Sequence, residues 1–283
     1  MNKIYFLLFL VSLAILGSFP SCYQSPPPVF DPNLAPIDSG DIFFSGYGWR
    51  IKASGFPVGP GPNFFSGSDK NVWIDANGYL HLKITKEGTQ WRSAEVISTA
   101  NMGYGTYVFT LANDVSKLNE KAVLGLFTWD DSTFYEQANS EIDIEFSRWN
   151  NASDSLLLTY SAQPVIFDNP VMYFERSYHP QMKVSALKTN TTHAFTWKSN
   201  EVTWASYAGD NFPGTSQLAN WRFDTSNQPR TKIEGGKTSL PIIVPAPGKT
   251  TNARMNLWLL GGQAPSDGKD IEVVIKSFKY TPL

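Results

Sequence analysis

Acidic residues occupy alternate positions in the run Glu141-Ile142-Asp143-Ile144-Glu145. In a β-strand alternate side chains share one face, so the three acids would point one way and the two isoleucines the other. Like charges this close oppose full ionisation, so at least one pKa should be raised. Cleavage of a glycosidic bond uses such a pair, one carboxylate to attack and a protonated partner to donate.

The spacing of these acids permits this chemistry without requiring it. The Cα atoms of Glu141 and Glu145 would lie about 13 Å apart along a strand. The carboxyl groups of a retaining glycosidase lie about 5–5.5 Å apart, and a concave, twisted sheet would tilt two long side chains together. A solvated acidic face is the alternative. A calcium site fits less well, because carboxylates along one strand lack the required loop.

The segments that would position this strand are also mostly strand-like, and convincing helical periodicity is absent. The nearest approach to a helix is the short stretch 113–123. Many short strands predict an all-β, two-sheet antiparallel sandwich, and the loop-rich stretches 162–192 and 208–252 could carry binding function. The expected strands are 79–85, 91–98, 104–111, 122–129, 140–147, 155–161, 193–198, 201–207, 253–260 and 270–280.

Composition narrows the class of protein. The chain has 283 residues, of which 42% are apolar and 17% charged, so one large domain with a buried core is expected. A net charge of −2 gives no attraction to nucleic acid. With three His and one Cys, a Cys/His metal site is disfavoured, and we expect no metal and no cofactor.

The N-terminus is typical of an export signal. Lys3 precedes the apolar run 4–17, which is too short to span a bilayer comfortably, and Cys22 follows a small residue. This resembles a bacterial lipoprotein processing site. We expect a signal peptide at 1–21, a lipidated Cys22 with a proline-rich tether over 22–40, and a catalytic domain over 41–283. The alternative is an ordinary signal peptide and a periplasmic or secreted protein.

The run from Glu141 to Phe146 resembles the active-site motif of glycoside hydrolase family 16, the β-jelly-roll endoglucanases and their relatives. The likeness continues in order over residues 75–282, with ill-matched loops between. The matching segments are Ser93-Ala94-Glu95, Gly103-Tyr104-Gly105-Thr106-Tyr107, Gly125-Leu126-Phe127-Thr128-Trp129, His193-Ala194-Phe195-Thr196-Trp197, Met255-Asn256-Leu257-Trp258 and Phe278-Lys279-Tyr280.

The resemblance implies a concanavalin A-like jelly roll with a concave substrate cleft. It also implies that Glu141 is the nucleophile, Asp143 the assisting residue and Glu145 the acid/base, with retained configuration. The strand lacks the extra residue that laminarinase-like members often carry before the last Glu, so it is similar to lichenases. Lichenases place a Trp two residues before the nucleophile, where this chain has Asn139.

Five further residues are candidates for substrate contact. Sugar rings stack on aromatic side chains and leave their hydroxyls to polar partners. By strand alternation, Asn256 and Trp258 share one face, opposite an apolar one. Trp129 and Glu95 match cleft positions of the family, and Tyr160 lies on the strand after the acids. For the aromatics, the alternative is packing; for Glu95, it is a plain surface acid.

These observations predict a retaining endo-acting glycosidase that cleaves β-linked glucan, mixed-linkage or β-1,3. A transglycosylase, a non-catalytic carbohydrate-binding lipoprotein and an inert adhesin remain alternatives. We expect a monomer whose partner is a polysaccharide, without nucleic acid, and with membrane contact only through the N-terminal lipid.

Overall fold

The computed structural model describes residues 41–165, 167–168, 171–172, 176–182, 184–224, 226, 233–234, 237–238 and 244–283. The expected signal peptide (1–21), the lipid attachment at Cys22 and the tether (22–40) lie outside these described residues. Within the described part, no helix has the length and apolar character needed to cross a membrane.

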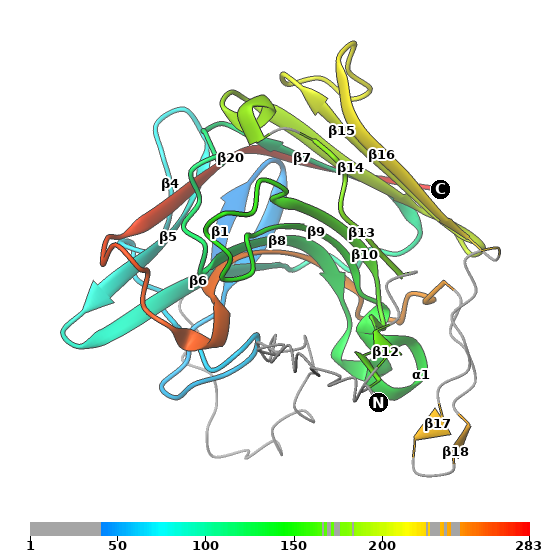
Figure 1. Ribbon diagram of the computed structural model, residues 1–283, viewed down its shortest axis with the longest axis horizontal. Helices are drawn as coiled ribbons and strands as arrows, with labels where there is room; N and C mark the ends of the chain where they lie inside the picture. Colours follow the sequence, from blue (N-terminus) through cyan, green and yellow to red (C-terminus); the bar gives the residue numbers. More distant parts are fainter. Residues whose placement is uncertain are drawn as a thin grey trace, which may run out of the picture.

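The strands follow one continuous antiparallel path that folds back on itself into two layers (Figure 1). The hairpin of β5 and β6 joins the layers, with Thr85 paired to Arg92. The first layer is curved. Its strands, in spatial order, are β13 (Ser177–Tyr178), β10 (Leu158–Ala162), β9 (Ile142–Phe146), β8 (Ala122–Trp129), β19 (Asn252–Leu259), β6 (Gln90–Ser98), β2 (Tyr47–Ile51) and β1 (Asp41–Phe44).

The second layer covers the convex side of the first and is continuous with it through β5. Short β3 (Phe64–Phe65) runs parallel to β6. The strands of the second layer, in order, are β4 (Val72–Ile74), β5 (Leu80–Glu87), β20 (Ile271–Pro282), β7 (Gly105–Leu111), β14 (Thr191–Trp197), β15 (Glu201–Ala208) and β16 (Gln217–Asp224).

The remaining elements are short. They are α1 (Phe134–Gln137), the 3₁₀ turns η1 (Asp131–Thr133), η2 (Ala138–Ser140), η4 (Val184–Leu187) and η6 (Leu260–Gly262), and the two-residue pairs β11 (Phe167–Asp168) with β12 (Val171–Met172) and β17 (Ile233–Glu234) with β18 (Lys237–Thr238).

The core lies between the two layers and is rich in aromatic rings. Phe195 of β14 stacks on Tyr107 of β7 with ring centroids 4.6 Å apart, and Phe278 of β20 lies 5.1 Å from Phe109. All four rings are almost completely buried. Burying large aromatics from several strands stabilises the sandwich, each contributing about 2–3 kcal/mol.

The all-β sandwich prediction is confirmed, and the ten expected strands are present with shifts of a few residues at their ends. The sequence did not predict the longer strands β1, β2 and β16 or the strands of two or three residues, which are β3, β4, β11, β12, β13, β17 and β18. The stretch 113–123, the nearest to a helical pattern, contains turns and the start of β8 instead of a helix.

Candidate active site

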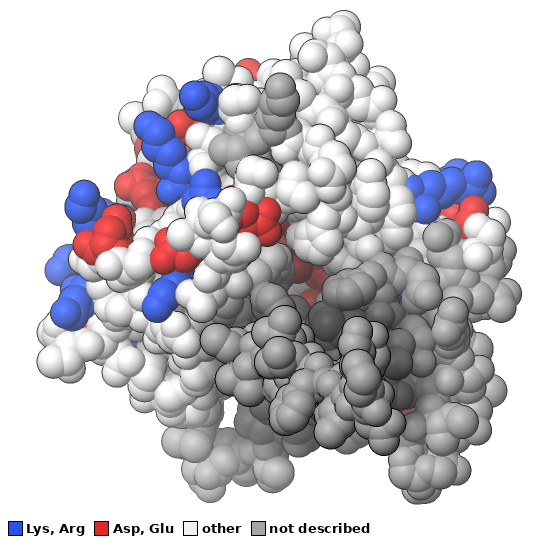
Figure 2. All heavy atoms as spheres, viewed as in Figure 1, with Lys and Arg blue, Asp and Glu red and all other residues white. Residues whose placement is uncertain are grey.

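Glu141, immediately before β9, and Asp143 and Glu145 within it lie on the concave side of the first layer. Ile142 and Ile144, the residues between them, are fully buried in the core. Glu145 is paired across the sheet with Gly125 of β8, and Asp143 with Ser161 of β10. Figure 2 shows acidic atoms in a hollow near the centre of the face in view.

Burial shifts the ionisation of all three acids in the same direction. It raises the pKa of Asp143 to about 7, although hydrogen bonds from Gln163 and Glu141 oppose the shift. Burial, followed by the charges of Asp143 and Glu145, raises the pKa of Glu141 well above its usual value. Burial and then the charge of Asp143 do the same for the pKa of Glu145. The site therefore retains protons at neutral pH, as general acid catalysis requires.

The backbone that enters β9 is constrained. Ala138, Asn139 and Ser140 have φ values of 47°, 60° and 54°, so three non-glycine residues in succession adopt the left-handed conformation immediately before Glu141. The Asn139 carbonyl accepts from the Asp130 N–H at 2.6 Å. Such strained conformations persist where the surrounding contacts hold them in place. Here they set the position of Glu141.

A row of residues crosses the concave face from Glu145 to Glu95. Between them, Gly125 of β8 donates its N–H to Asn256 Oδ1 at 3.1 Å, and Asn256 Nδ2 lies 3.4 Å from Glu95 Oε2. A Cβ on Gly125 would lie 2.5 Å from Asn256 Oδ1, so a larger residue would have to displace the Asn256 side chain. Asn256 and Glu95 lie on the predicted face, but both are buried and bind each other.

Two positively charged side chains that were not among the predicted site residues lie beside Glu95. Lys52 Nζ lies 2.9 Å from Glu95 Oε2 and 2.7 Å from the Gly59 carbonyl. Arg254 Nη1 lies 3.4 Å from Glu95 Oε1. Burial lowers the pKa of Lys52, while the Glu95 charge opposes that shift. By strand alternation Arg254 shares a face with Asn256, but nothing in the sequence signals Lys52, which follows β2.

The two candidate tryptophans differ in exposure. Trp129 stays partly exposed, donates from Nε1 to Asp131 Oδ1 at 2.7 Å, and has the Arg254 guanidinium 5.4 Å from its ring centroid. Trp258 is only 5% exposed and packs with Phe65 and Val123. The prediction that Trp258 forms an open sugar platform was wrong, because these side chains cover its ring.

Tyr160 lies on the opposite face from the acids. It pairs across the sheet with Ile144, is fully buried, and its hydroxyl contacts Ser206 Oγ at 2.5 Å. Ser206 also contacts His193 Nδ1 at 2.7 Å, so the histidine is part of the same buried group. The prediction that Tyr160 contacts substrate was therefore wrong: its side chain belongs to the core.

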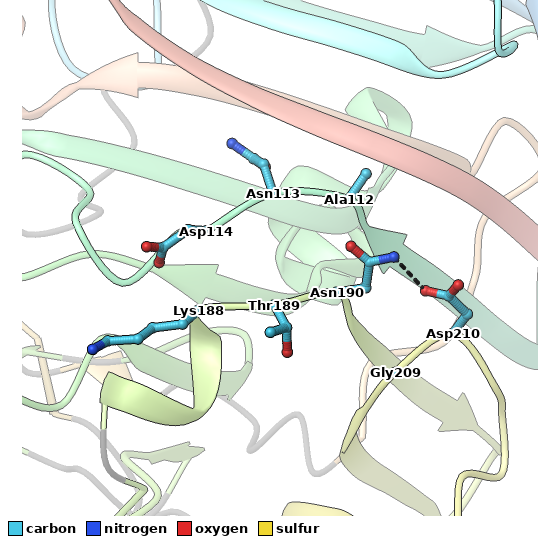
Figure 3. Close-up of a pocket in the computed structure, with 8 residues that line it drawn as sticks. All are labelled: Ala112, Asn113, Asp114, Lys188, Thr189, Asn190, Gly209 and Asp210. Atoms are coloured by element: carbon cyan, nitrogen blue, oxygen red, sulfur yellow. Dashed lines mark hydrogen bonds between the residues drawn. The ribbon is translucent and has the colours of Figure 1, made fainter.

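A separate polar hollow lies among loops of the second layer (Figure 3). Asn190 donates to Asp210 at 2.9 Å within it, and Asp114 and Lys188 lie on its other side. None of the predicted site residues lines this hollow. Among the described residues, no group of three or more His, Cys, Asp or Glu side chains is arranged to hold a metal ion.

The fold and the acid strand invite comparison with known proteins. No protein-family model and no curated protein matches the chain. Solved structures do match. A β-glucanase of Bacillus licheniformis is 17% identical with a TM-score of 0.55, covering 87% of this chain and 97% of that one.

Two further structures show the range of these matches. A laminarinase of Flavobacterium sp. UMI-01 is 12% identical with a TM-score of 0.55, covering 82% of this chain and 92% of that one. An immunostimulatory antigen and pseudo β-1,3-glucanase of Mycobacterium tuberculosis is 16% identical with a TM-score of 0.57, covering 83% and 91%. At these identities the likeness shows the fold, and the resemblance to glycoside hydrolase family 16 is confirmed at that level.

Proposed function

We propose that this protein is a retaining, endo-acting glycoside hydrolase that cleaves β-linked glucan, mixed-linkage or β-1,3. The observation that carries the proposal is the set of three acids with raised pKa values, Glu141, Asp143 and Glu145, on the concave face at β9 and the residue before it. A plain surface strand would leave such acids solvated and ionised. The fold shared with a β-glucanase and a laminarinase supports the same substrate class.

In this reaction Glu145 begins protonated and Glu141 must become ionised. The Glu145 proton passes to the leaving oxygen as the glycosidic C–O bond breaks, while a Glu141 oxygen bonds to the anomeric carbon. Water then attacks that carbon, gives its proton to Glu145, and releases Glu141. Asp143 accepts the proton that it shares with Glu141, so that the nucleophile carries the negative charge during attack.

The substrate would lie along the concave face, where Trp129 offers a partly exposed ring for a sugar to stack on. Asn256 and Glu95 would act indirectly, by holding the floor of the cleft. We also propose that the chain is exported as a monomer and tethered by lipid at Cys22, which would leave the domain free to reach polysaccharide outside the membrane.

A second candidate function is carbohydrate binding without turnover. Three observations favour it: Trp258 and Glu95 are covered, Asn139 stands where lichenases have Trp, and one structural neighbour is described as a pseudo-glucanase. Binding alone, however, has no need for three like charges on one strand face.

To test this proposal, the protein is incubated with mixed-linkage β-glucan, laminarin and xyloglucan, and the new reducing ends are counted. Glu141→Gln is the site variant. Glu87→Gln, which removes an exposed carboxylate at the end of β5, is the control. We expect reducing ends from one β-glucan, a fall of about a thousandfold or more in Glu141→Gln, and no change in Glu87→Gln.

Tight binding without release of reducing ends would favour the non-catalytic function. Activity that persists in Glu141→Gln would refute the assignment of the nucleophile. Products longer than the starting chains would indicate transfer to sugar instead of water.

A further inference from the structure

Gln163 follows β10 and is fixed at its backbone and at its side chain. Its backbone N–H donates to the Glu141 carbonyl at 3.1 Å. Its side-chain Nε2 donates to Asp143 Oδ2 at 3.1 Å, and its Oε1 accepts from the Val165 N–H at 2.7 Å. The backbone carbonyl accepts from Arg176 Nη2 at 2.7 Å. With the side chain 9% exposed, these contacts leave it little freedom.

The contact with Val165 decides which way the amide of Gln163 points. A backbone N–H can only donate, so the amide oxygen must face Val165 and the NH₂ group must face Asp143. An NH₂ group cannot accept a hydrogen bond. Asp143 Oδ2 must therefore act as an acceptor and carries no proton, and a donated hydrogen bond of this kind favours the ionised form of the carboxyl group.

We propose, on the basis of the proposed function, that Gln163 is a positioning residue of the acid site. Its hydrogen bond keeps Asp143 ionised. The proton that Glu141 and Asp143 share therefore stays on Glu141. When Glu141 attacks the sugar, its O–H bond breaks and an O–H bond forms on Asp143, so no proton leaves the site. Gln163 sets how readily Asp143 accepts that proton, and it does so without touching the sugar.

Other charged groups near Asp143 have different positions. Glu141 and Glu145 flank it on its own strand. From β8 its paired neighbour is the non-ionisable Phe127, and from β10 it is Ser161. Arg254 of β19 lies one strand further, Arg176 binds the carbonyl of Gln163, and Trp204 of β15 donates to the backbone carbonyl of Asp143. Of these groups, Gln163 and Glu141 bond to the carboxyl itself.

The direction of the effect follows from this contact. Burial raises the pKa of Asp143 to about 7, and the Gln163 hydrogen bond keeps that pKa lower than burial alone would make it. Removing the donor should raise the pH at which the pair releases its first proton by about one unit. Below that pH both acids are protonated and Glu141 cannot attack, so the acidic limb of kcat/KM should move upward with it.

The experiment follows the carboxyl carbons of ¹³C-labelled protein by NMR from pH 4 to pH 9, with kcat/KM measured over the same range. The variants are Gln163→Leu and Gln163→Met, which both remove the donor and the acceptor without adding a charge, and Gln163→Met also keeps the length of the side chain. The matched control is Ser161→Ala: Ser161 is paired with Asp143 across the sheet, but its hydroxyl donates to Ser177 Oγ.

We expect the titration near pH 7 to move up by about one unit in both Gln163 variants and to stay in place in Ser161→Ala. An unmoved titration in either folded variant would overturn the proposal, and Gln163→Met decides alone if Gln163→Leu does not fold. The titration needs no substrate. A protein that cleaves no polysaccharide but still shows the shift would refute the proposed function and leave the role of Gln163 standing.

Discussion

Two buried polar groups lie on opposite faces of the first layer, and they are built differently. On the concave face, Glu141, Asp143 and Glu145 are acids crowded against one another. On the core face, the Tyr160 hydroxyl and His193 share Ser206 Oγ, and His193 Nε2 contacts Thr191 Oγ1 at 2.8 Å. The core group pairs unlike neutral partners, as buried polar groups usually do. The acid group places like charges together.

The two groups should make stability depend on pH in opposite directions. Asp143 has a folded pKa of about 7 against an unfolded value of 3.8, so the folded state binds more protons and stability falls as pH rises through that window. Burial lowers the folded pKa of His193 from 6.5 to about 3, so the unfolded state binds more protons there and stability falls as pH drops below 6.5. The contrast indicates that the core group stabilises the fold, whereas the acid group lowers the stability of the fold.

The largest expected effect comes from removing the proposed proton donor of the acid group. Glu145→Gln should lower kcat/KM on polysaccharide by about 10²- to 10⁴-fold. An aryl glycoside with a good leaving group needs little protonation, so its first step should be slowed far less. Comparing the two substrates in the variant checks this role. Equal losses on both would show that Glu145 is not the general acid.

The next largest effect should come from breaking the core group. Ser206→Ala removes the partner of the Tyr160 hydroxyl and of His193 Nδ1, and each unsatisfied buried group costs about 1–3 kcal/mol. We expect the free energy of unfolding, measured with urea, to fall by about 2–4 kcal/mol. Ser153→Ala, at an exposed serine, is the control. A loss no larger than the control's would mean that the core group contributes nothing.

The smallest effect should have the opposite sign. Asp143→Asn keeps the shape of the side chain and removes one charge from the acid group, so it should stabilise the protein by roughly 1–3 kcal/mol above pH 7. The gain should vanish near pH 4, where Asp143 is already protonated in the fold. Thermal unfolding at both pH values tests this, with about 2–4 °C expected for each kcal/mol. Equal gains at both pH values would contradict the explanation by charge.

The orientation of the acid strand was predictable because its pattern is unambiguous. Ile142 and Ile144 alternate with acids, which leaves one choice of core face. The strand of Tyr160 carries no such signal: all five residues of β10 are buried, so alternation could not show that Tyr160 faces the core. Its face follows only from the pairing with Ile144.

The side chains that cover parts of the concave face could not be predicted from single segments of the sequence. Trp258 lies on the expected face, yet the residue that packs over it, Phe65, comes from a strand almost two hundred positions earlier. Lys52 reaches Glu95 in the same way, through the pairing of β2 with β6. Contacts of this range depend on tertiary packing, which periodicity within a strand does not encode.

One contact from the second layer extends the reach of the site beyond its own face. Trp204 of β15 donates its indole N–H to the backbone carbonyl of Asp143 at 3.0 Å and stacks on Trp221 of β16, with ring centroids 4.8 Å apart. A strand near the edge of the second layer thus helps to hold the backbone of Asp143 in place from the core side. A survey of substitutions for lost turnover should therefore find sensitive positions in β15, in the layer opposite the three acids.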